Sequence, residues 1–311
     1  RDGPLPRLGL GLGGVAPASD SIPRLRTLAP AHLRVDIRPS EDTWRETLAR
    51  ACEVARGCRT GLEVAAFVPA ETRGRDLTAL ADAARDLTAP LDAWLVFDAE
   101  TRTTTPELAA SARESFAGPA AAPTLGGGTD GFFAELNRER AAARDVDLVC
   151  LSLNPQVHAF DDATLVENLS SLAAMAATAR SFSGNAPLAL SPVTLLPRPG
   201  RDPRQRTLFA AGWTLGLIAS AAEAGFGRLT LFETDGAGGV MEEGELVPVG
   251  HVLAELAALA ASAPEVRVVA AWPSDRSRCL TLGVQAGSLL RLYVFNPTPR
   301  PLEVVVAGLA A

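Results

Sequence analysis

Short apolar runs alternate with Ala-, Leu- and Arg-rich amphipathic stretches along most of the chain, and this alternation limits the folds open to it. Eight runs have the length of buried strands: Leu8–Gly13, His32–Arg38, Leu62–Val68, Leu91–Phe97, Ala121–Gly126, Val146–Leu153, Pro187–Ser191 and Arg228–Phe232. Each is followed by a stretch with helical periodicity: Ser21–Leu28, Ser40–Arg56, Arg75–Thr88, Pro106–Phe116, Phe132–Arg144, Asp161–Ser181, Pro203–Ala224 and Val247–Ala261. Eight strand–helix pairs predict an α/β fold, a (β/α)8 TIM barrel over residues 1–263.

Residues at the ends of these stretches support the predicted helices. Thr105-Pro106 and Asp202-Pro203 each place an N-cap residue before a proline at the first helical position. Gly57 and Gly225 lie where helix C-caps are expected.

The competing architecture is a doubly wound open sheet, in which the glycine-rich segment Leu8–Gly14 would bind a phosphate. That segment alternates Gly with Leu, lacks the G-x-G-x-x-G spacing and has no ribose-binding acid about 20 residues further on. Close packing of barrel backbone explains these glycines better.

After Pro264 the apolar residues alternate with a period of two, which predicts antiparallel strands. Four short strands make half of a β-sandwich, and one face of a single sheet needs a cover. The chain begins at Arg1 without Met, as a cut end would. We expect residues 264–311 to form a small antiparallel β domain, a partial β-sandwich, that packs on the barrel or is completed by an N-terminal segment absent here. The predicted strands are Val266–Trp272, Cys279–Val284, Leu289–Phe295 and Leu302–Ala307.

Composition excludes several classes of function. The net charge is −7 and no dense basic cluster occurs, so nucleic acid is not an expected partner. All 29 basic residues are arginine, which excludes a Schiff-base lysine. No apolar run reaches the ~18 residues of a membrane span. The four scattered cysteines fit neither a CxxC pair nor usual zinc spacing, so we expect buried thiols in a reducing cytoplasm.

Polar residues gather just after the apolar runs, where active sites of barrel enzymes are built. The sixth run ends in Asn154-Pro-Gln-Val-His-Ala-Phe-Asp161, and the eighth ends at Glu233. General acid–base hydrolysis needs an imidazole or carboxylate of this kind. The predicted catalytic residues are His158, Glu233 and Glu135, and the predicted substrate-binding residues are Asp36, Asn137, Asn154, Asp161 and Arg204. Asp36, His158 and Glu233 could also bind a metal, but no compact H-x-H or H-E-x-x-H signature supports that, so neither metal nor cofactor is predicted.

Several segments, in the right order, resemble the D-apionate lactonase family of bacterial sugar-acid catabolism. The similar segments are Asn154–Asp161, Gly126–Thr129 with Phe133–Arg138, Ser191–Thr194, Asp202–Gln205, and Phe232–Gly236 followed by Gly239–Met241. The resemblance covers residues 8–262 closely and the C-terminal strands loosely. It implies the architecture of a clan-A glycoside hydrolase, a barrel flanked by a β-sandwich built from both chain ends. It also implies hydrolysis of a sugar-derived lactone, such as one formed in D-apiose degradation, to the sugar acid.

Two other functions stay open on the sequence alone. The enzymatic alternative is a clan-A glycoside hydrolase, but that family places an Asn-Glu pair after strand four and a nucleophilic Glu after strand seven. Here strand four ends in Asp98-Ala-Glu100, and strand seven ends in Ser191-Pro-Val-Thr194 without a carboxylate. The other alternative is a non-catalytic sugar-binding barrel, which the aromatic content of 5% mildly disfavours. A small sugar-derived substrate is the expected partner, and the oligomeric state is not predicted.

Overall fold

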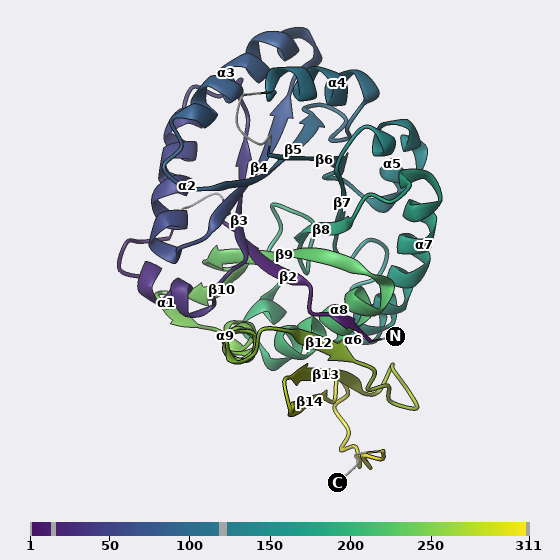
Figure 1. Ribbon diagram of the computed structural model, residues 1–311. Helices are drawn as coiled ribbons and strands as arrows, with labels where there is room; N and C mark the ends of the chain where they lie inside the picture. The colour runs from purple at the N-terminus through teal and green to yellow at the C-terminus, as the bar shows by residue number, and fades with distance from the viewer. Residues whose placement is uncertain (1, 14–16, 118–122, 309–311) are drawn as a thin grey trace.

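A closed barrel of eight parallel strands, ringed by helices, forms the body of the protein (Figure 1). The computed structural model describes residues 2–13, 17–117 and 123–308. Strand β9 pairs in parallel with both β2 and β8, and this double pairing closes the barrel. The barrel strands are β2 (Arg7–Gly11), β3 (His32–Ile37), β4 (Gly61–Val68), β5 (Leu91–Asp98), β6 (Thr124–Thr129), β7 (Leu148–Leu153), β8 (Leu188–Val193) and β9 (Phe226–Asp235). The predicted fold class is confirmed.

A helix follows each barrel strand, as predicted. Thr105 caps its helix by accepting a hydrogen bond from the Leu108 amide, and Gly225 ends another in the left-handed conformation. Two helix ends differ from the prediction. The prediction for Gly57 is wrong, because Arg59 takes the left-handed C-cap position. Residues 203–206 form a separate 3-10 turn. The helices are α1 (Ile22–Thr27), α2 (Trp44–Cys58), α3 (Arg73–Arg85), α4 (Pro106–Ser115), α5 (Phe133–Arg138), α6 (Asp162–Glu167), α7 (Ser171–Ser183), α8 (Leu208–Ala224) and α9 (Pro248–Ser262).

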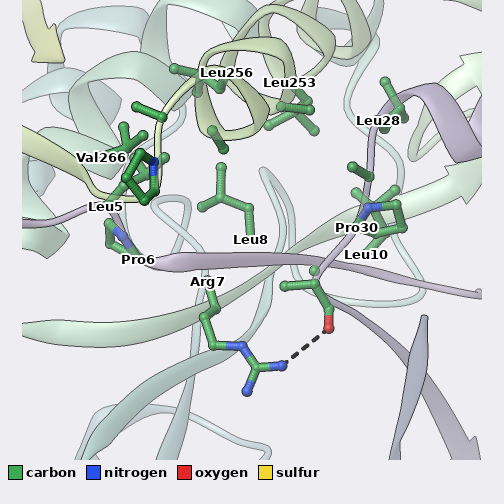
Figure 2. Close-up of a pocket in the computed structure, with 17 residues that line it drawn as sticks. Leu5, Pro6, Arg7, Leu8, Leu10, Leu28, Pro30, Leu253, Leu256 and Val266 are labelled. Carbon is green, nitrogen blue, oxygen red and sulfur yellow. Dashed lines mark hydrogen bonds between the residues drawn. The ribbon is translucent and has the colours of Figure 1, made fainter. Parts of the chain in front are cut away.

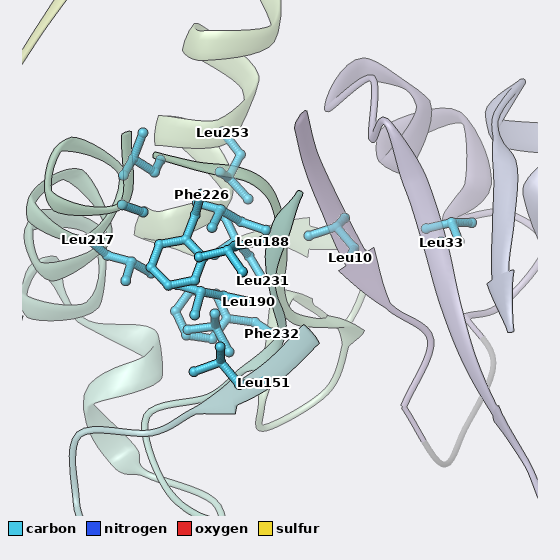
Figure 3. Packing of buried hydrophobic residues seen from close by; sticks show 14 of the residues in the cluster. Leu10, Leu33, Leu151, Leu188, Leu190, Leu217, Phe226, Leu231, Phe232 and Leu253 are labelled. Carbon is cyan, nitrogen blue, oxygen red and sulfur yellow. The ribbon is translucent and has the colours of Figure 1, made fainter. Parts of the chain in front are cut away.

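The main hydrophobic core lies between the barrel wall and the helices. Figure 3 shows Phe226 and Leu231 of β9 packed beside Leu188 of β8, against Leu217 of α8. A smaller apolar cluster fills part of the barrel interior; its members are Ala65, Phe67, Leu95, Phe97, Leu148, Cys150 and Ala189. The rest of the interior is polar, and those polar residues lead to the mouth of the barrel.

The glycines of β2 and the residues after it allow close approach, as the sequence predicts. A Cβ on Gly9 would lie 2.2 Å from the ring of His32, and one on Gly11 would lie 2.7 Å from a backbone oxygen of β9. Gly13 has a φ of +69° and packs against the carboxyl group of Glu233. These contacts confirm the interpretation as closely packed barrel backbone. Gly14 lies outside the described residues.

Both ends of the chain contribute to a second, antiparallel sheet. Its order is β1 (Gly3–Pro4), β12 (Val266–Val269), β13 (Leu280–Ala286) and β14 (Leu289–Phe295), and it packs mainly on α8. The predicted strand at residues 302–307 is wrong, because those residues pair with no strand. Val305 in that segment is 84% exposed, so its β-branched sequence lacks the packing that would favour a strand there. No helix in the described ranges is both long and apolar enough to cross a bilayer.

Replacing Gly212 by Ala should loosen the second sheet from the barrel. A Cβ at this position of α8 would lie 2.0 Å from the ring of Phe295 in β14, so the ring must move. Overpacking of this kind costs about 1–3 kcal/mol, and urea unfolding measures it. Gly227→Ala is the control, because a Cβ there meets nothing within 4 Å. Equal stability of the two variants would show that Gly212 is not needed for this contact.

Candidate active site at the carboxyl ends of the barrel strands

A chain of buried hydrogen bonds forms the floor of the site. Arg34 Nη1 donates to Ser191 Oγ over 3.0 Å, and Ser191 donates to Glu63 Oε1 over 2.5 Å. Thr230 Oγ1 also donates to Glu63 Oε1, so the partner of Thr230, the Nε2 of His32 at 2.8 Å, carries the proton. Glu63 Oε2 lies 2.7 Å from Arg228 Nε. These hydrogen bonds fix the orientation of Ser191 and Glu63, whereas Nδ1 of His32 and Nη2 of Arg228 are buried without a hydrogen-bond partner among the described residues.

Arg34 connects this floor to two carboxylates at the mouth. Its Nε donates to Asp36 Oδ1 over 2.8 Å, and its Nη2 donates to Asp130 Oδ1. Burial alone would raise the pKa of Asp36, but Arg34 and Arg198 outweigh burial and hold that pKa well below its usual range. Asp36 is therefore an anion and a weak base. This arrangement suits a hydrogen-bond acceptor for substrate hydroxyls better than a proton acceptor in catalysis.

Asp130 is at the centre of the candidate site but is not among the residues predicted from the sequence. Its buried carboxylate is contacted by three guanidinium groups, those of Arg34, Arg102 and Arg198. Arg198 bridges the two carboxylates, with Nη1 at 2.7 Å from Asp36 Oδ2 and Nη2 at 2.9 Å from Asp130. The sequence signal was present, since Asp130 directly follows a glycine-rich strand, but nothing in the sequence showed that three arginines converge on it.

Glu233 reaches the mouth because of a β-bulge. Leu231 and Glu233 pair with consecutive residues of β2, so Phe232 is the extra residue, with a φ of +53°. Regular alternation would place Phe232 inside the barrel with Thr230 and turn Glu233 outward. The bulge reverses this: Phe232 packs in the outer core (Figure 3), and Glu233 pairs with Arg201 at 3.0 Å. A bulky residue at positive φ stores strain, which is typical of functional sites.

Glu135 and Asn137 lie on the short helix α5. Glu135 Oε2 is buried without a hydrogen-bond partner among the described residues, and its other oxygen is 3.8 Å from Arg138. An unsatisfied buried carboxylate oxygen is available to a ligand. Asn137 Oδ1 already accepts from Arg140 Nη2 over 2.6 Å at the end of the helix. Of the two, Glu135 is the better placed to contact substrate.

His158 lines a cleft of about 340 Å³ over β7, beside α5 and α7. The side chain of His158 is exposed. Asn154 lines the same cleft, and its Oδ1 is buried without a partner in the described chain. Neither Glu135 nor Glu233 lines this cleft. The structure therefore brings His158 together with Asn154, and Glu233 together with Arg201, but it does not bring the two pairs into one pocket.

Arg204 and Asp161 hold the loop that carries His158. All five N–H groups of Arg204 have acceptors, which are Asp202 Oδ1 and Oδ2, the Phe160 carbonyl, Asp162 Oδ1 and Gln156 Oε1. Hydrogen bonds from Arg204 and Gln156 outweigh burial and lower the pKa of Asp202. Asp161 caps α6 by accepting from the Thr164 amide over 2.9 Å. Both residues thus have a structural use, and neither has a donor or acceptor directed at the mouth.

Arg204→Lys should loosen the His158 loop without unfolding the barrel. One ammonium group cannot replace five donors in a planar fork, so the loop loses its anchors to residues 156, 160 and 162. We expect faster amide hydrogen exchange at residues 156–162 and a loss of about 1–2 kcal/mol of stability. Arg45→Lys is the control, because that arginine has a cation–π contact with its neighbour Trp44 and no hydrogen bond or ion pair among the described residues. Unchanged exchange in the loop would contradict the anchoring role.

The buried His32 should make the fold acid-sensitive. Burial lowers the pKa of His32 from 6.5 to about 3, with a further lowering from Arg228 that Glu63 opposes. The unfolded chain therefore binds a proton below pH 6.5 that the folded chain does not bind, so stability falls as pH falls. Between pH 7 and pH 4.5 this one group removes about 2–3 kcal/mol. Glu63, whose pKa is also lowered, adds its own loss below about pH 4.5.

Urea unfolding of wild type and His32→Gln between pH 4.5 and pH 7 measures this effect. The amide can still donate to Thr230, and we expect the variant to lose the part of the pH slope due to His32. His158→Gln is the matched control, because His158 is exposed and its loss should leave the slope unchanged. Identical slopes for all three proteins would contradict a neutral, buried His32.

A second cavity, of about 280 Å³, lies at the opposite end of the barrel, between β2 and α9 (Figure 2). Leu8, Leu253 and Leu256 are typical of its lining, and Arg7 is its one titratable residue, with Nη2 turned to the Ala31 carbonyl at 3.3 Å. An apolar lining with one paired arginine offers no base and no nucleophile. The chemistry of the protein is therefore expected at the mouth.

Comparisons with known proteins concern the barrel as a whole. A family model described as the D-apionate lactonase TIM-barrel domain matches residues 7–261, which include every barrel strand and all the residues of the mouth. The D-apionate lactonase of Brucella anthropi is 32% identical over 141 residues, which are 39% of this chain and 23% of that protein. The chain thus spans about a quarter of the length of the relative that it matches.

Solved structures of glycoside hydrolases share the fold. A GH30 endoxylanase from Clostridium papyrosolvens superposes with a TM-score of 0.65 at 12% identity, over 94% of this chain and 81% of that one. A 4-O-α-L-rhamnosyl-β-D-glucuronidase from Fusarium oxysporum gives 0.63 at 13% identity, over 95% and 78%. At such identities the likeness concerns the fold alone.

Proposed function

The chain belongs to the D-apionate lactonase family, and from that premise we propose that the whole protein hydrolyses a sugar-derived lactone to the free sugar acid. The observation that carries this proposal is the bulge at Phe232, which turns a carboxylate, Glu233, into a barrel mouth rich in hydrogen-bonding groups. A lactone needs a base to activate water and donors for the oxyanion that forms at its carbonyl oxygen.

In the proposed reaction Glu233 is the general base. It takes a proton from a water molecule whose oxygen attacks the lactone carbonyl carbon, and the tetrahedral intermediate collapses with cleavage of the ring C–O bond. The departing alkoxide takes up a proton and becomes a hydroxyl group, while the new carboxylic acid ionises near neutral pH. One water is consumed and one proton is released. Arg201 orients Glu233 through their 3.0 Å ion pair.

The remaining predicted residues have narrower roles in this proposal. Glu135 Oε2 and Asn154 Oδ1, two buried oxygens without a hydrogen-bond partner among the described residues, accept hydrogen bonds from substrate hydroxyls. Asp36, whose carboxyl group stays ionised, helps to hold the sugar by accepting hydrogen bonds. His158 contacts substrate groups that extend into its cleft. Asn137, Asp161 and Arg204 shape the loops around the mouth.

Among the described residues, neither strand end used by the glycosidase mechanism has a carboxylate placed to act across the sugar. The seventh barrel strand, β8, ends in Ser191-Pro192-Val193. After the fourth, β5, Asp98 Oδ1 accepts from the Thr101 amide within its own turn, and Glu100 is exposed. A retaining glycosidase needs two carboxyl groups about 5 Å apart across the sugar. We also propose a reducing, cytoplasmic setting, because all four cysteines are buried free thiols.

A substrate panel tests the proposed function. The purified protein should accelerate ring opening of aldonolactones, D-apionolactone among them, and leave p-nitrophenyl glycosides intact. Cleavage of an aryl glycoside with no effect on lactones would replace the proposal by the glycosidase alternative. Binding of lactones without turnover would instead indicate a sugar-binding barrel.

A further inference from the structure

The charged cluster around Asp130 has more positive than negative groups. Two carboxylates, Asp36 and Asp130, face three guanidinium groups, those of Arg34, Arg102 and Arg198. The neighbouring ion pairs, Arg201 with Glu233 and Arg228 with Glu63, are balanced and leave this excess uncompensated. The five groups of this cluster therefore carry one more positive than negative charge, in a protein whose net charge is −7.

Arg38 adds to this excess. Its guanidinium carbon lies 4.4 Å from the ring centroid of Phe67, and it has no carboxylate partner among the described residues. Two rim carboxylates, Asp98 and Asp235, are directed into their own turns, where they accept from the amides of Thr101 and Gly236. Neither carboxylate forms an ion pair with the five groups of the cluster among the described residues.

The surplus charge is also accessible and has free donors. The side chain of Arg34 is 2% exposed, whereas those of Arg198 and Arg102 are 26% and 42% exposed. Arg102 uses Nε and Nη2 on Asp130, and Arg198 uses Nη1 and Nη2 on the two carboxylates. Arg102 Nη1 and Arg198 Nε therefore have no acceptor within the described chain. Guanidinium N–H groups of this kind bind carboxylates strongly.

We propose that Arg102 and Arg198 form a carboxylate subsite that holds the acid group of the ring-opened sugar acid. This inference rests on the proposed function, in which a neutral lactone becomes an anion. The cluster has an excess of positive charge, and the sugar derivative acquires a negative charge only when its ring opens. The cluster therefore favours the ring-opened acid. The protein then recognises an aldonate more strongly than an uncharged sugar derivative of the same length, and its product competes with its substrate.

Calorimetric titration of the protein with D-ribonate, with ribitol and with acetate tests this subsite. Ribitol has the same carbon chain without the charge, and acetate has the charge without the chain. We expect ribonate to bind at least about tenfold more tightly than ribitol, and more weakly as NaCl is raised from about 20 to about 200 mM. Arg102→Met and Arg198→Met should each weaken ribonate about tenfold and leave ribitol unchanged. Acetate alone binding as tightly as ribonate would overturn an aldonate site.

Arg206→Met is the matched control, since Arg206 pairs one-to-one with Glu242 and its loss should leave ribonate binding intact. Equal affinities for ribonate and ribitol, or wild-type affinity in both mouth variants, would overturn the inference. A thermal melt of Arg102→Met, the more exposed of the two, confirms folding. Turnover separates this subsite from the proposed function. If the protein hydrolyses lactones but ribonate does not inhibit it, the subsite is refuted and the proposed function stands. If ribonate binding depends on the two arginines but no lactone is hydrolysed, the proposed function is refuted and the subsite stands.

Discussion

Glu233→Gln is expected to lower kcat for lactone hydrolysis by about 10²–10⁴-fold, the usual contribution of a general base. The amide keeps the size of the side chain and can still contact the Arg201 loop, but it cannot take a proton from water. KM should change little, because substrate hydroxyls are held by other residues. Initial rates on an aldonolactone, with the spontaneous rate subtracted, measure the effect.

Two controls make this result specific. Glu242 also pairs with an arginine, Arg206, and follows the last barrel strand in the sequence. The Glu242→Gln variant should therefore keep the wild-type kcat. Glu135→Gln removes the other predicted carboxylate and should raise KM more than it lowers kcat, if Glu135 accepts a substrate hydroxyl. A kcat of Glu233→Gln within threefold of wild type, together with a large loss in Glu135→Gln, would transfer the role of base to Glu135.

Arg34→Met should be the most destabilising single substitution at the mouth. Removing the guanidinium leaves the buried carboxylate of Asp130 with one partner fewer and takes donors from Asp36 and Ser191. Breaking a buried ion pair from one side costs about 3–5 kcal/mol. Denaturant unfolding at pH 7 measures the loss, since Asp36 and Arg34 are both fully charged there.

Arg102→Met provides the comparison, because Arg102 also contacts Asp130 but is 42% exposed against 2% for Arg34. An exposed ion pair contributes about 0–1 kcal/mol, so the two variants should differ severalfold in their effect on stability. Similar losses in both would mean that the floor of the site is more hydrated than its burial indicates.

Most of the fold was predictable from sequence, because the period of the apolar pattern determines strand and helix directly. The barrel strands and helices occur where the alternation predicts them, with ends shifted by a few residues. Two errors had local causes. Gly57 lies inside α2, where a Cβ would come within 2.5 Å of Ile22, so this glycine allows close helix packing and is not a C-cap. Residues 302–307 have the pattern of a strand but pair with no strand in the part of the chain that the structure describes.

The site was predictable at the level of strand ends and not at the level of contacts. The sequence indicated Asp36 and Glu233, but simple alternation gives no reason for the bulge at Phe232 that aims Glu233 inward. Nor could spacing show that arginines from three separate segments meet at Asp130, or that the donors of Arg204 are used on Asp202 and on the loop of residues 156–162. Such contacts depend on which strands become neighbours when the barrel closes.

The central claim is that the barrel mouth opens a sugar lactone by general-base attack of water. Proton release during ring opening of D-apionolactone, followed at constant pH with wild type and Glu233→Gln side by side, tests it most directly. We expect one proton to be released per lactone opened, at a rate well above the spontaneous one for wild type and close to it for the variant. A wild-type rate equal to the spontaneous rate would contradict the claim, and so would a variant as fast as wild type.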